Sequence, residues 1–266
     1  MVAGPVLAPL IGLHGLFLIT AAGALSGIAI VHFLVPHVIS KAPRGETIAV
    51  PALLGKLIKN TQLQRLNIGI FILHLALTAM FVVLPLKLQN MHLNAAEHWH
   101  IYLPALLLSF ILIIPMLIIA ARKNMNKQFY LFAITLMAAS FIAIALTSHS
   151  IAAMFIAILL YFTAFNFLEA SLPAFISMLA PAGAKGSAMG IYSSMQFMGA
   201  FVGGSLGGWV LQNYGVNVLF VGLGVLVVLW AIVIGQSSAP QHLTSVRLTT
   251  DGNCSELQLA SLMSLP

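Results

Sequence analysis

The sequence is poor in charge, and poorest in negative charge. Only five of its 266 residues are Asp or Glu, and charged residues amount to 6% of the chain, whereas a soluble domain carries about 25%. Hydrophobic residues reach 61%, and the mean hydropathy is +1.05. This composition excludes a soluble fold, and the lack of low-complexity repeats excludes a disordered or fibrous chain. It predicts an integral membrane protein.

Cysteine and the usual catalytic patterns are also scarce. The single cysteine, Cys254, can form no internal disulfide and no multi-cysteine metal site. No GxSxG or HExxH pattern occurs, and the AGAKGS stretch at 182–187 lacks the spacing of a phosphate-binding loop. His92, His98 and His100 place no tight pair of ligands on one helical face, so we expect a wet loop there and no metal. No enzymatic activity and no cofactor are predicted.

Long apolar runs are what the sequence has in abundance. A membrane-spanning helix needs about 20 mostly apolar residues, because its backbone must satisfy its own hydrogen bonds. Seven runs meet this length, at 15–35, 65–87, 99–121, 128–148, 151–179, 187–213 and 216–235. Because these runs do not alternate apolar and polar residues, they are typical of helices and not of barrel strands. The sequence predicts an all-α membrane protein.

Basic residues gather in alternate loops and predict the orientation. If the loop at 36–64 is cytoplasmic, the regions 122–127, 180–186 and the tail from 236 are cytoplasmic too. These regions and their helix edges hold Lys41, Arg44, Lys56, Lys59, Arg65, Arg122, Lys123, Lys127, Lys185 and Arg247. The opposite side has only Lys87. This bias predicts a cytoplasmic C-terminus, and the net charge of +6 indicates contact with anionic lipid, not nucleic acid.

The longest internal loop, 36–64, divides the chain. Its segment LLGKLIKNTQLQRL, at 53–66, has amphipathic spacing and is expected to lie along the membrane surface. The run of helices at 65–235 then forms one self-contained unit. Before the loop, the apolar start MVAGPVLAPLI is too short to span and resembles the end of a further helix, since no basic stretch marks a signal peptide.

Several stretches together resemble the major facilitator superfamily. AGPVLAP, with Gly4 and Pro5, is similar to the end of the Gly-Pro antiporter motif on the fifth helix of that family. LHGLFLITAAGALSGIAIVHFLVP resembles the sixth helix. Four later stretches resemble helices seven, eight, ten and eleven of its bacterial YajR-type proton-driven antiporters: NIGIFILHLALTAMFVVLP, AAEHWHIYL, AFNFLEASLPAFIS and PAGAKGSAMGIYSSMQFMGAFVGGSLGGW.

This resemblance implies a division of the chain. Residues 1–35 would be the end of the fifth and the whole sixth helix, 36–64 the central cytoplasmic loop, and 65–235 the C-terminal six-helix bundle. The tail, 236–266, would be the truncated start of a ferredoxin-like domain, because HLTSVRLTT is similar to its first strand. We therefore expect a fragment of a transporter whose partner is the missing N-terminal bundle, although a functional half-length transporter remains an alternative.

Glu169 is the acidic residue that lies within an apolar run. An isolated buried carboxylate is costly, so it neutralises, pairs or faces a water-filled cavity. Asn166 shares its helical face. One hypothesis is a group that binds and releases protons or recognises a cation; the other is a structural carboxylate satisfied by neighbouring helices.

His74 is the second candidate for proton coupling. It lies on a stripe with Asn67, Phe71, Thr78 and Phe81, at steps of three or four residues. Histidine titrates near neutral pH and could exchange protons with a carboxylate. A histidine satisfied by packing is the alternative.

Nine residues are predicted to line a substrate cavity, on the basis of aromatic, sulfur and amide side chains along the central helices. They are Asn67, Phe71, Phe81, Phe162, Phe165, Asn166, Tyr192, Met195 and Gln196. Gly199, Gly203 and Gly207 repeat at i+4, which lets two helices approach closely, either as a gating seam or as static packing. By the resemblance, Gly4 and Pro5 belong to the same packing and gating set.

The leading functional hypothesis is part of a secondary active transporter in the bacterial inner membrane. It would export a small amphipathic compound against proton entry, with the lipid bilayer, the substrate and protons as its partners. A seven-helix receptor or sensor is the alternative, suggested by the span count alone. A membrane enzyme has no catalytic constellation to support it.

Overall fold

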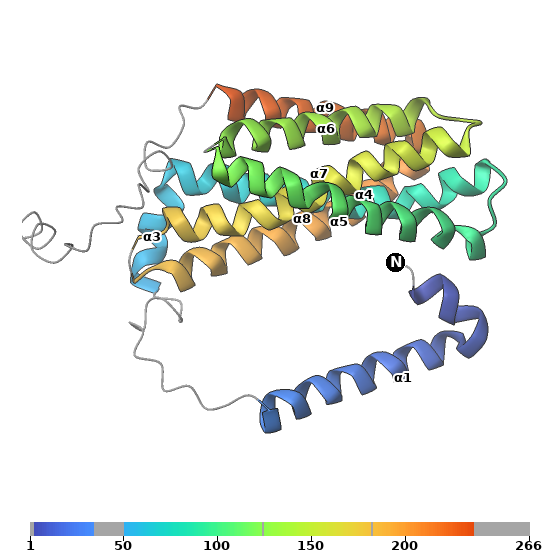
Figure 1. Cartoon of the computed structure of the whole chain (residues 1–266), viewed down its shortest axis with the longest axis horizontal. Helices are drawn as coiled ribbons and strands as arrows, with labels where there is room; N and C mark the ends of the chain where they lie inside the picture. The colour runs from blue at the N-terminus through green and yellow to red at the C-terminus, as the bar shows by residue number, and fades with distance from the viewer. Residues whose placement is uncertain (1–2, 35–50, 124, 182, 237–266) are drawn as a thin grey trace, which may run out of the picture.

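The computed structural model describes residues 3–34, 51–123, 125–181 and 183–236 (Figure 1). Within these ranges the chain forms eight α-helices, one short 3-10 helix and no strand. The helices are α1 (Ala3–Leu34), α3 (Pro51–Lys59), α4 (Thr61–Asn90), η1 (Ala95–Glu97), α5 (Trp99–Arg122), α6 (Asn126–Leu146), α7 (Ile151–Leu179), α8 (Lys185–Tyr214) and α9 (Val216–Gly235). The predicted all-α class is confirmed. The predictions for 36–50 and for the ferredoxin-like tail lie outside the described residues.

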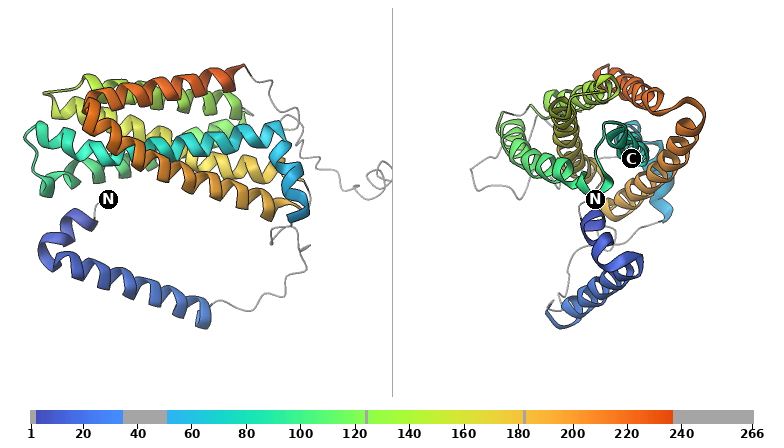
Figure 2. Two further views of the ribbon diagram at one scale, coloured as in Figure 1. Left: turned by 180° about the vertical axis from the view of Figure 1, so that it is seen from behind. Right: turned by 90° about the vertical axis from the view of Figure 1, so that its right-hand side faces the viewer.

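Six helical segments of the described chain are long and apolar enough to cross a membrane. They are His14–Leu34, Thr61–Asn90, Ala95–Arg122, Asn126–Leu146, Ile151–Leu179 and Val216–Gly235. Helix α8, which corresponds to the predicted span at 187–213, is not among them, because its glycine, serine and amide residues lower its hydropathy. It is nevertheless 30 residues long and packs along α4 within the bundle (Figure 2).

Helix α1 lies apart from the bundle (Figures 1 and 2). It bends at Gly12, whose φ of 67° and ψ of 178° are not helical. The short N-terminal run and the first predicted span are thus two helical segments joined at Gly12. Its apolar side chains are open to the surroundings; Phe17 is 67% and Phe33 77% exposed. Such a helix needs lipid or another protein surface to cover it.

Helix α3 runs across one end of the bundle and contacts α4 and α8. The predicted amphipathic segment 53–66 is therefore not one surface helix, since it breaks at Asn60. The Asn60 Oδ1 accepts hydrogen bonds from the backbone N–H of Gln62 and Leu63, at 3.0 and 3.2 Å. This cap starts α4 four residues before the predicted span.

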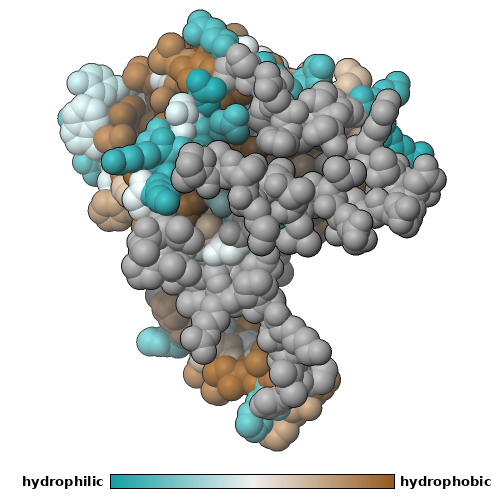
Figure 3. All heavy atoms as spheres, turned by 90° about the vertical axis from the view of Figure 1, so that its left-hand side faces the viewer, coloured by the Kyte–Doolittle hydropathy of each residue, from teal (hydrophilic) through white to brown (hydrophobic). Residues whose placement is uncertain are grey.

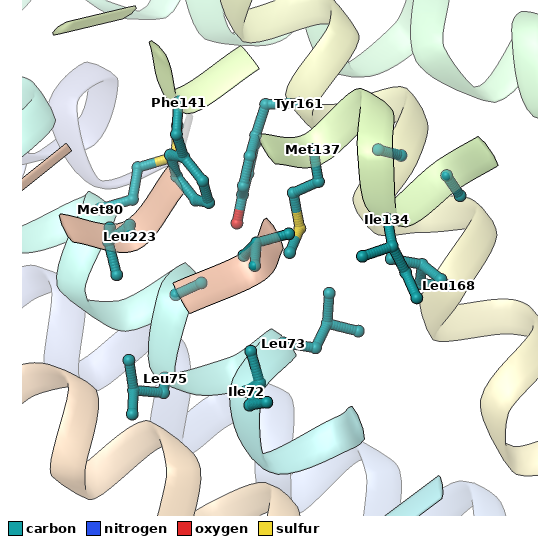
Figure 4. Close-up of a cluster of buried hydrophobic side chains, with 14 of the residues drawn as sticks. Ile72, Leu73, Leu75, Met80, Ile134, Met137, Phe141, Tyr161, Leu168 and Leu223 are labelled. Carbon is teal, nitrogen blue, oxygen red and sulfur yellow. The ribbon is translucent and has the colours of Figure 1, made fainter. Parts of the chain in front are cut away.

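The core of the bundle lies between α4, α6, α7 and α9 (Figure 4). Met137 and Phe141 of α6 pack with Tyr161 of α7 and Leu223 of α9, and the Phe141 and Tyr161 rings are 5.3 Å apart. The outward faces of α5 and α9 carry exposed Leu, Ile and Val residues. An apolar exterior around an apolar core is typical of a helix bundle in lipid.

One end of the bundle is basic. Here α3 and the starts of α4, α6 and α8 meet the end of α5. These segments carry Lys56, Lys59, Arg65, Arg122, Lys123, Lys127 and Lys185. Figure 3 looks onto this end, where hydrophilic residues gather. We call it the basic end, and the opposite end, where α4 finishes, the far end.

Candidate functional site

Three polar side chains from three helices meet inside the bundle. His74 comes from α4, Glu169 from α7 and Gln196 from α8. The Gln196 amide nitrogen lies 2.8 Å from His74 Nε2 and donates to Glu169 Oε1 over 3.2 Å. His74 Nδ1 lies 3.9 Å from Glu169 Oε2. We call these three residues the polar triad.

The hydrogen bonds of the triad constrain its protons. An amide nitrogen carries two hydrogens and accepts none, so Gln196 in this orientation makes His74 Nε2 an acceptor. The ring proton of a neutral His74 is then on Nδ1, which faces Glu169 Oε2. Neither Nδ1 nor Oε2 has a hydrogen-bond partner among the described residues. A neutral His74 can therefore present its Nδ1–H to an ionised Glu169, and a small approach would turn the 3.9 Å contact into a hydrogen bond.

The two titratable side chains differ in exposure. The side chain of Glu169 is 35% exposed and that of His74 12%. Glu169 is thus the more exposed member of the pair, and its carboxylate accepts one hydrogen bond, from the Gln196 amide. This geometry is compatible with both hypotheses made for Glu169, proton handling and structural pairing.

Aromatic rings extend from the triad between α4, α7 and α5. Phe165 lies 5.9 Å from the His74 ring and stacks on Tyr161 at 5.9 Å. One turn away, Phe162 and Phe81 are 6.2 Å apart, and Phe81 is also 6.2 Å from Tyr102 on α5. Four candidates thus lie on one aromatic path, with rings that offer apolar, adaptable contact area.

Among the described residues, no hydrogen bond or ring contact joins the remaining cavity candidates to the triad. Asn166 donates to Ser109 on α5 over 2.8 Å. Asn67 and Tyr192 are buried, and the Asn67 Oδ1 and Tyr192 hydroxyl have no partner among the described residues. Met195 and Phe71 are partly buried against the core.

Helices α4 and α8 touch through backbone atoms at the predicted glycines. A Cβ on Gly199 would overlap the Phe71 carbonyl oxygen, and one on Gly203 would overlap the Leu75 carbonyl oxygen. A Cβ on Gly207 would come within 2.9 Å of the Ala79 Cα. We call these contacts the glycine seam. The other packing candidates, Gly4 and Pro5, both fall within α1.

Sequence reasoning missed several members of this region. Ser109 is fully buried and accepts from Asn166. Thr78 donates to the Ala200 carbonyl across the glycine seam over 2.9 Å. Tyr161 lies beside two of the candidate rings. The signal for Thr78 was present, because it shares the stripe of His74, but helical spacing does not show which neighbouring helix a side chain meets.

The long apolar helices and the polar triad inside their bundle are typical of a polytopic membrane protein. Comparison with known proteins identifies the family. The sequence model of the Major Facilitator Superfamily matches residues 109–245. The chain belongs to this superfamily, which confirms the predicted family. Because the superfamily consists of transporters, the prediction that the chain is not an enzyme is confirmed as well.

Individual relatives point the same way. The chain is 35% identical over 253 residues to the Inner membrane transport protein YajR of Escherichia coli, covering 95% of this chain and 56% of the relative. It is 27% identical over 206 residues to the Uncharacterized transporter BU466 of Buchnera aphidicola from Acyrthosiphon pisum, covering 76% of this chain and 52% of that protein. The chain thus spans about half the length of the curated relatives it matches. Membership of a transporter family also removes the basis of the receptor alternative, which rested on the number of spans.

Proposed function

We propose that the chain is part of a secondary active transporter that couples proton entry to the export of a small amphipathic compound. The observation that carries this proposal is the polar triad, because it joins a carboxylate, an imidazole and an amide from three helices inside an apolar bundle. Ionisable groups in membrane segments that face the bundle interior are commonly proton or substrate sites.

Proton coupling is supported by the way Glu169 is held. Its Oε1 accepts one bond from Gln196, while Oε2 faces the His74 ring. A proton on Glu169 removes a negative charge, and a proton on His74 creates a positive one, where both side chains have limited contact with water. The occupancy of the proton can therefore favour one arrangement of α4, α7 and α8 over another.

An amphipathic substrate is supported by the mixture of side chains. Phe165 lies one helical turn before Glu169, and Phe162 lies one turn before Asn166. The ring of Phe81 on α4 is close to that of Phe162. Aromatic rings next to a carboxylate suit a compound with an apolar body and a polar or cationic group. Met195, partly buried nearby on α8, adds an adaptable contact.

The proposed transporter has two bundles. The described chain supplies the six helices α4 to α9 as one bundle, and α1 lies beside it with its apolar side chains uncovered. In transporters of this kind, substrate and ion sites lie between two bundles that rock against each other. We propose that a second bundle covers α1 and closes the triad side, and that the site of action is the bacterial inner membrane, as the name of the E. coli relative states for that protein.

Proton-driven transport is expected from the complete transporter that contains this segment, and not from residues 1–266 alone. The measurement is efflux of fluorescent amphipathic dyes from proteoliposomes under an imposed pH gradient, with a proton ionophore as the control. Efflux by the complete transporter that persists after the gradient is collapsed would contradict proton coupling. Gradient-driven efflux by the 266-residue chain alone would contradict the need for a second bundle.

The basic end is expected to face the cytoplasm, because basic loops are retained on that side. Reporter fusions after residues 123 and 184 should therefore read cytoplasmic, and a fusion after residue 93, at the far end, should read external. A matched pair of reporters, one active only inside and one only outside, gives each site two independent readings. An external signal after residue 123 would reverse the proposed orientation.

A further inference from the structure

Lys87 lies away from the lysines and arginines of the basic end. It is at the far end of the bundle, in the last turn of α4. It is only 5% exposed. Its ammonium group donates to Asn217 Oδ1 over 2.8 Å and to the Ala145 carbonyl over 3.3 Å. Lys87 thereby joins α4 to the end of α6 and the start of α9, but both acceptors are neutral. Its positive charge has no carboxylate partner among the described residues.

A pocket of about 510 Å³ opens beside this lysine. It lies where α4 ends, between the α6–α7 and α8–α9 junctions. Its polar lining includes Lys87, Asn90, Ser148, His149, Tyr214 and Asn217. No acidic residue lines it, and it shares no residue with the polar triad. The pocket is therefore a second polar site, distinct from the polar triad.

The start of α9 adds a second source of positive potential to the pocket. Gly215, the N-cap residue, has φ 84° and provides no side-chain cap, and Gly215 and Val216 both line the pocket. The first backbone N–H groups of a helix have no intrahelical acceptor, and the helix dipole is positive at this end. Backbone N–H groups of this kind, combined with a lysine, are a common anion-binding arrangement.

We propose that the Lys87 pocket binds a phosphate group, carried either by a phospholipid headgroup or by a free anion. Two of the three ammonium hydrogens of Lys87 have acceptors in the described chain; the third is available to a ligand. A phosphate would supply the missing negative charge, accept from Lys87 and from the α9 N-terminus, and meet His149 at the exposed rim. The position at the end of the spanning helices is where lipid headgroups lie.

The decisive variant is Asn217→Asp. It keeps the size of the side chain and the bond to Lys87, and it supplies an internal carboxylate that competes with any bound anion. Phosphate binding should fall by at least about tenfold, the effect of losing one charge-assisted contact, while thermal stability should be kept or raised. Asn94→Asp makes the same chemical change at the same end, at an exposed residue outside the pocket, and should leave binding unchanged.

Two probes distinguish the source of the phosphate. Inorganic phosphate is titrated into the lipid-free 266-residue chain in neutral detergent by calorimetry, and retention of phosphatidylglycerol is measured by native mass spectrometry. Binding in the first assay that Asn217→Asp removes indicates a free anion site; retention in the second that it removes indicates a headgroup site. His149→Glu, at the exposed rim, should weaken the same binding without touching the Lys87 bonds. Absence of binding in both assays, or equal binding by the wild type and Asn217→Asp, would overturn the proposal.

Discussion

Glu169→Gln is expected to reduce proton-driven efflux by the complete transporter to background while leaving the protein folded. Glutamine keeps the shape of the side chain and retains an oxygen that accepts from Gln196, whose bond to Glu169 Oε1 is 3.2 Å. It cannot take up or release a proton, so the 3.9 Å pair with His74 loses its titrating member. Substrate binding should persist, because the aromatic path beside the triad is unchanged. The measurements are pH-gradient-driven efflux and substrate-triggered proton release.

Two further variants make this result interpretable. Glu169→Asp keeps a carboxylate set back by one methylene group and should retain partial activity. Glu97→Gln removes an exposed carboxylate in η1, outside the triad, and should transport normally. Unchanged coupling in Glu169→Gln, or its failure to fold, would instead assign Glu169 a structural role.

Gly203→Ala is expected to destabilise the bundle by about 2 kcal/mol or more, at the upper part of the range for overpacking. The added Cβ would overlap the Leu75 carbonyl oxygen, which is a backbone atom and cannot rotate away. Helices α4 and α8 would have to separate, and the bond from Thr78 to the Ala200 carbonyl, at 2.9 Å, would lengthen. The measurement is the unfolding midpoint in detergent, by denaturant titration of the purified chain.

The neighbouring residue provides a matched control. A Cβ on Gly204 meets no atom within 4 Å, so Gly204→Ala should stabilise helix α8 by about 0.5–1 kcal/mol, the usual difference between alanine and glycine in a helix. The two variants make the same chemical change one residue apart and should move the midpoint in opposite directions. A similar midpoint shift in both would show that the close approach of α4 and α8 is not what requires glycine.

The apolar runs predicted the spans, and helical periodicity predicted which residues share a face, but neither predicted how the helices face one another. Helical spacing predicted that Asn166 and Glu169 share a face of one helix. In the structure Asn166 turns to Ser109 on α5, while Glu169 meets Gln196 and His74 on two other helices. Spacing along one helix fixes which residues share a face, whereas the rotation of each helix against its neighbours depends on packing throughout the bundle.

The same limit applies to Lys87 and to the amphipathic segment. Counted along the sequence, Lys87 looked like an external basic residue, but the ends of α6 and α9 enclose it. The segment 53–66 read as one surface helix because its apolar spacing continues through Asn60, although an asparagine at that position also favours a new helix start. The predicted span at 187–213 differs for another reason: α8 packs through glycine, which favours close contact but lowers hydropathy.

The glycine seam holds two members of the polar triad, His74 and Gln196, on two closely packed helices. His74 lies between Phe71 and Leu75, whose carbonyls press against Gly199 and Gly203, and Gln196 precedes Gly199 by less than one turn. Backbone contact and the Thr78 bond make α4 and α8 a rigid unit, so the spacing between the imidazole and the amide is set by the scaffold. Glu169 lies on α7, which packs against α8 less extensively than α4 does. If Glu169 carries the coupling proton, as we propose, we expect α7 to be the helix that changes its position relative to α4 and α8 during transport.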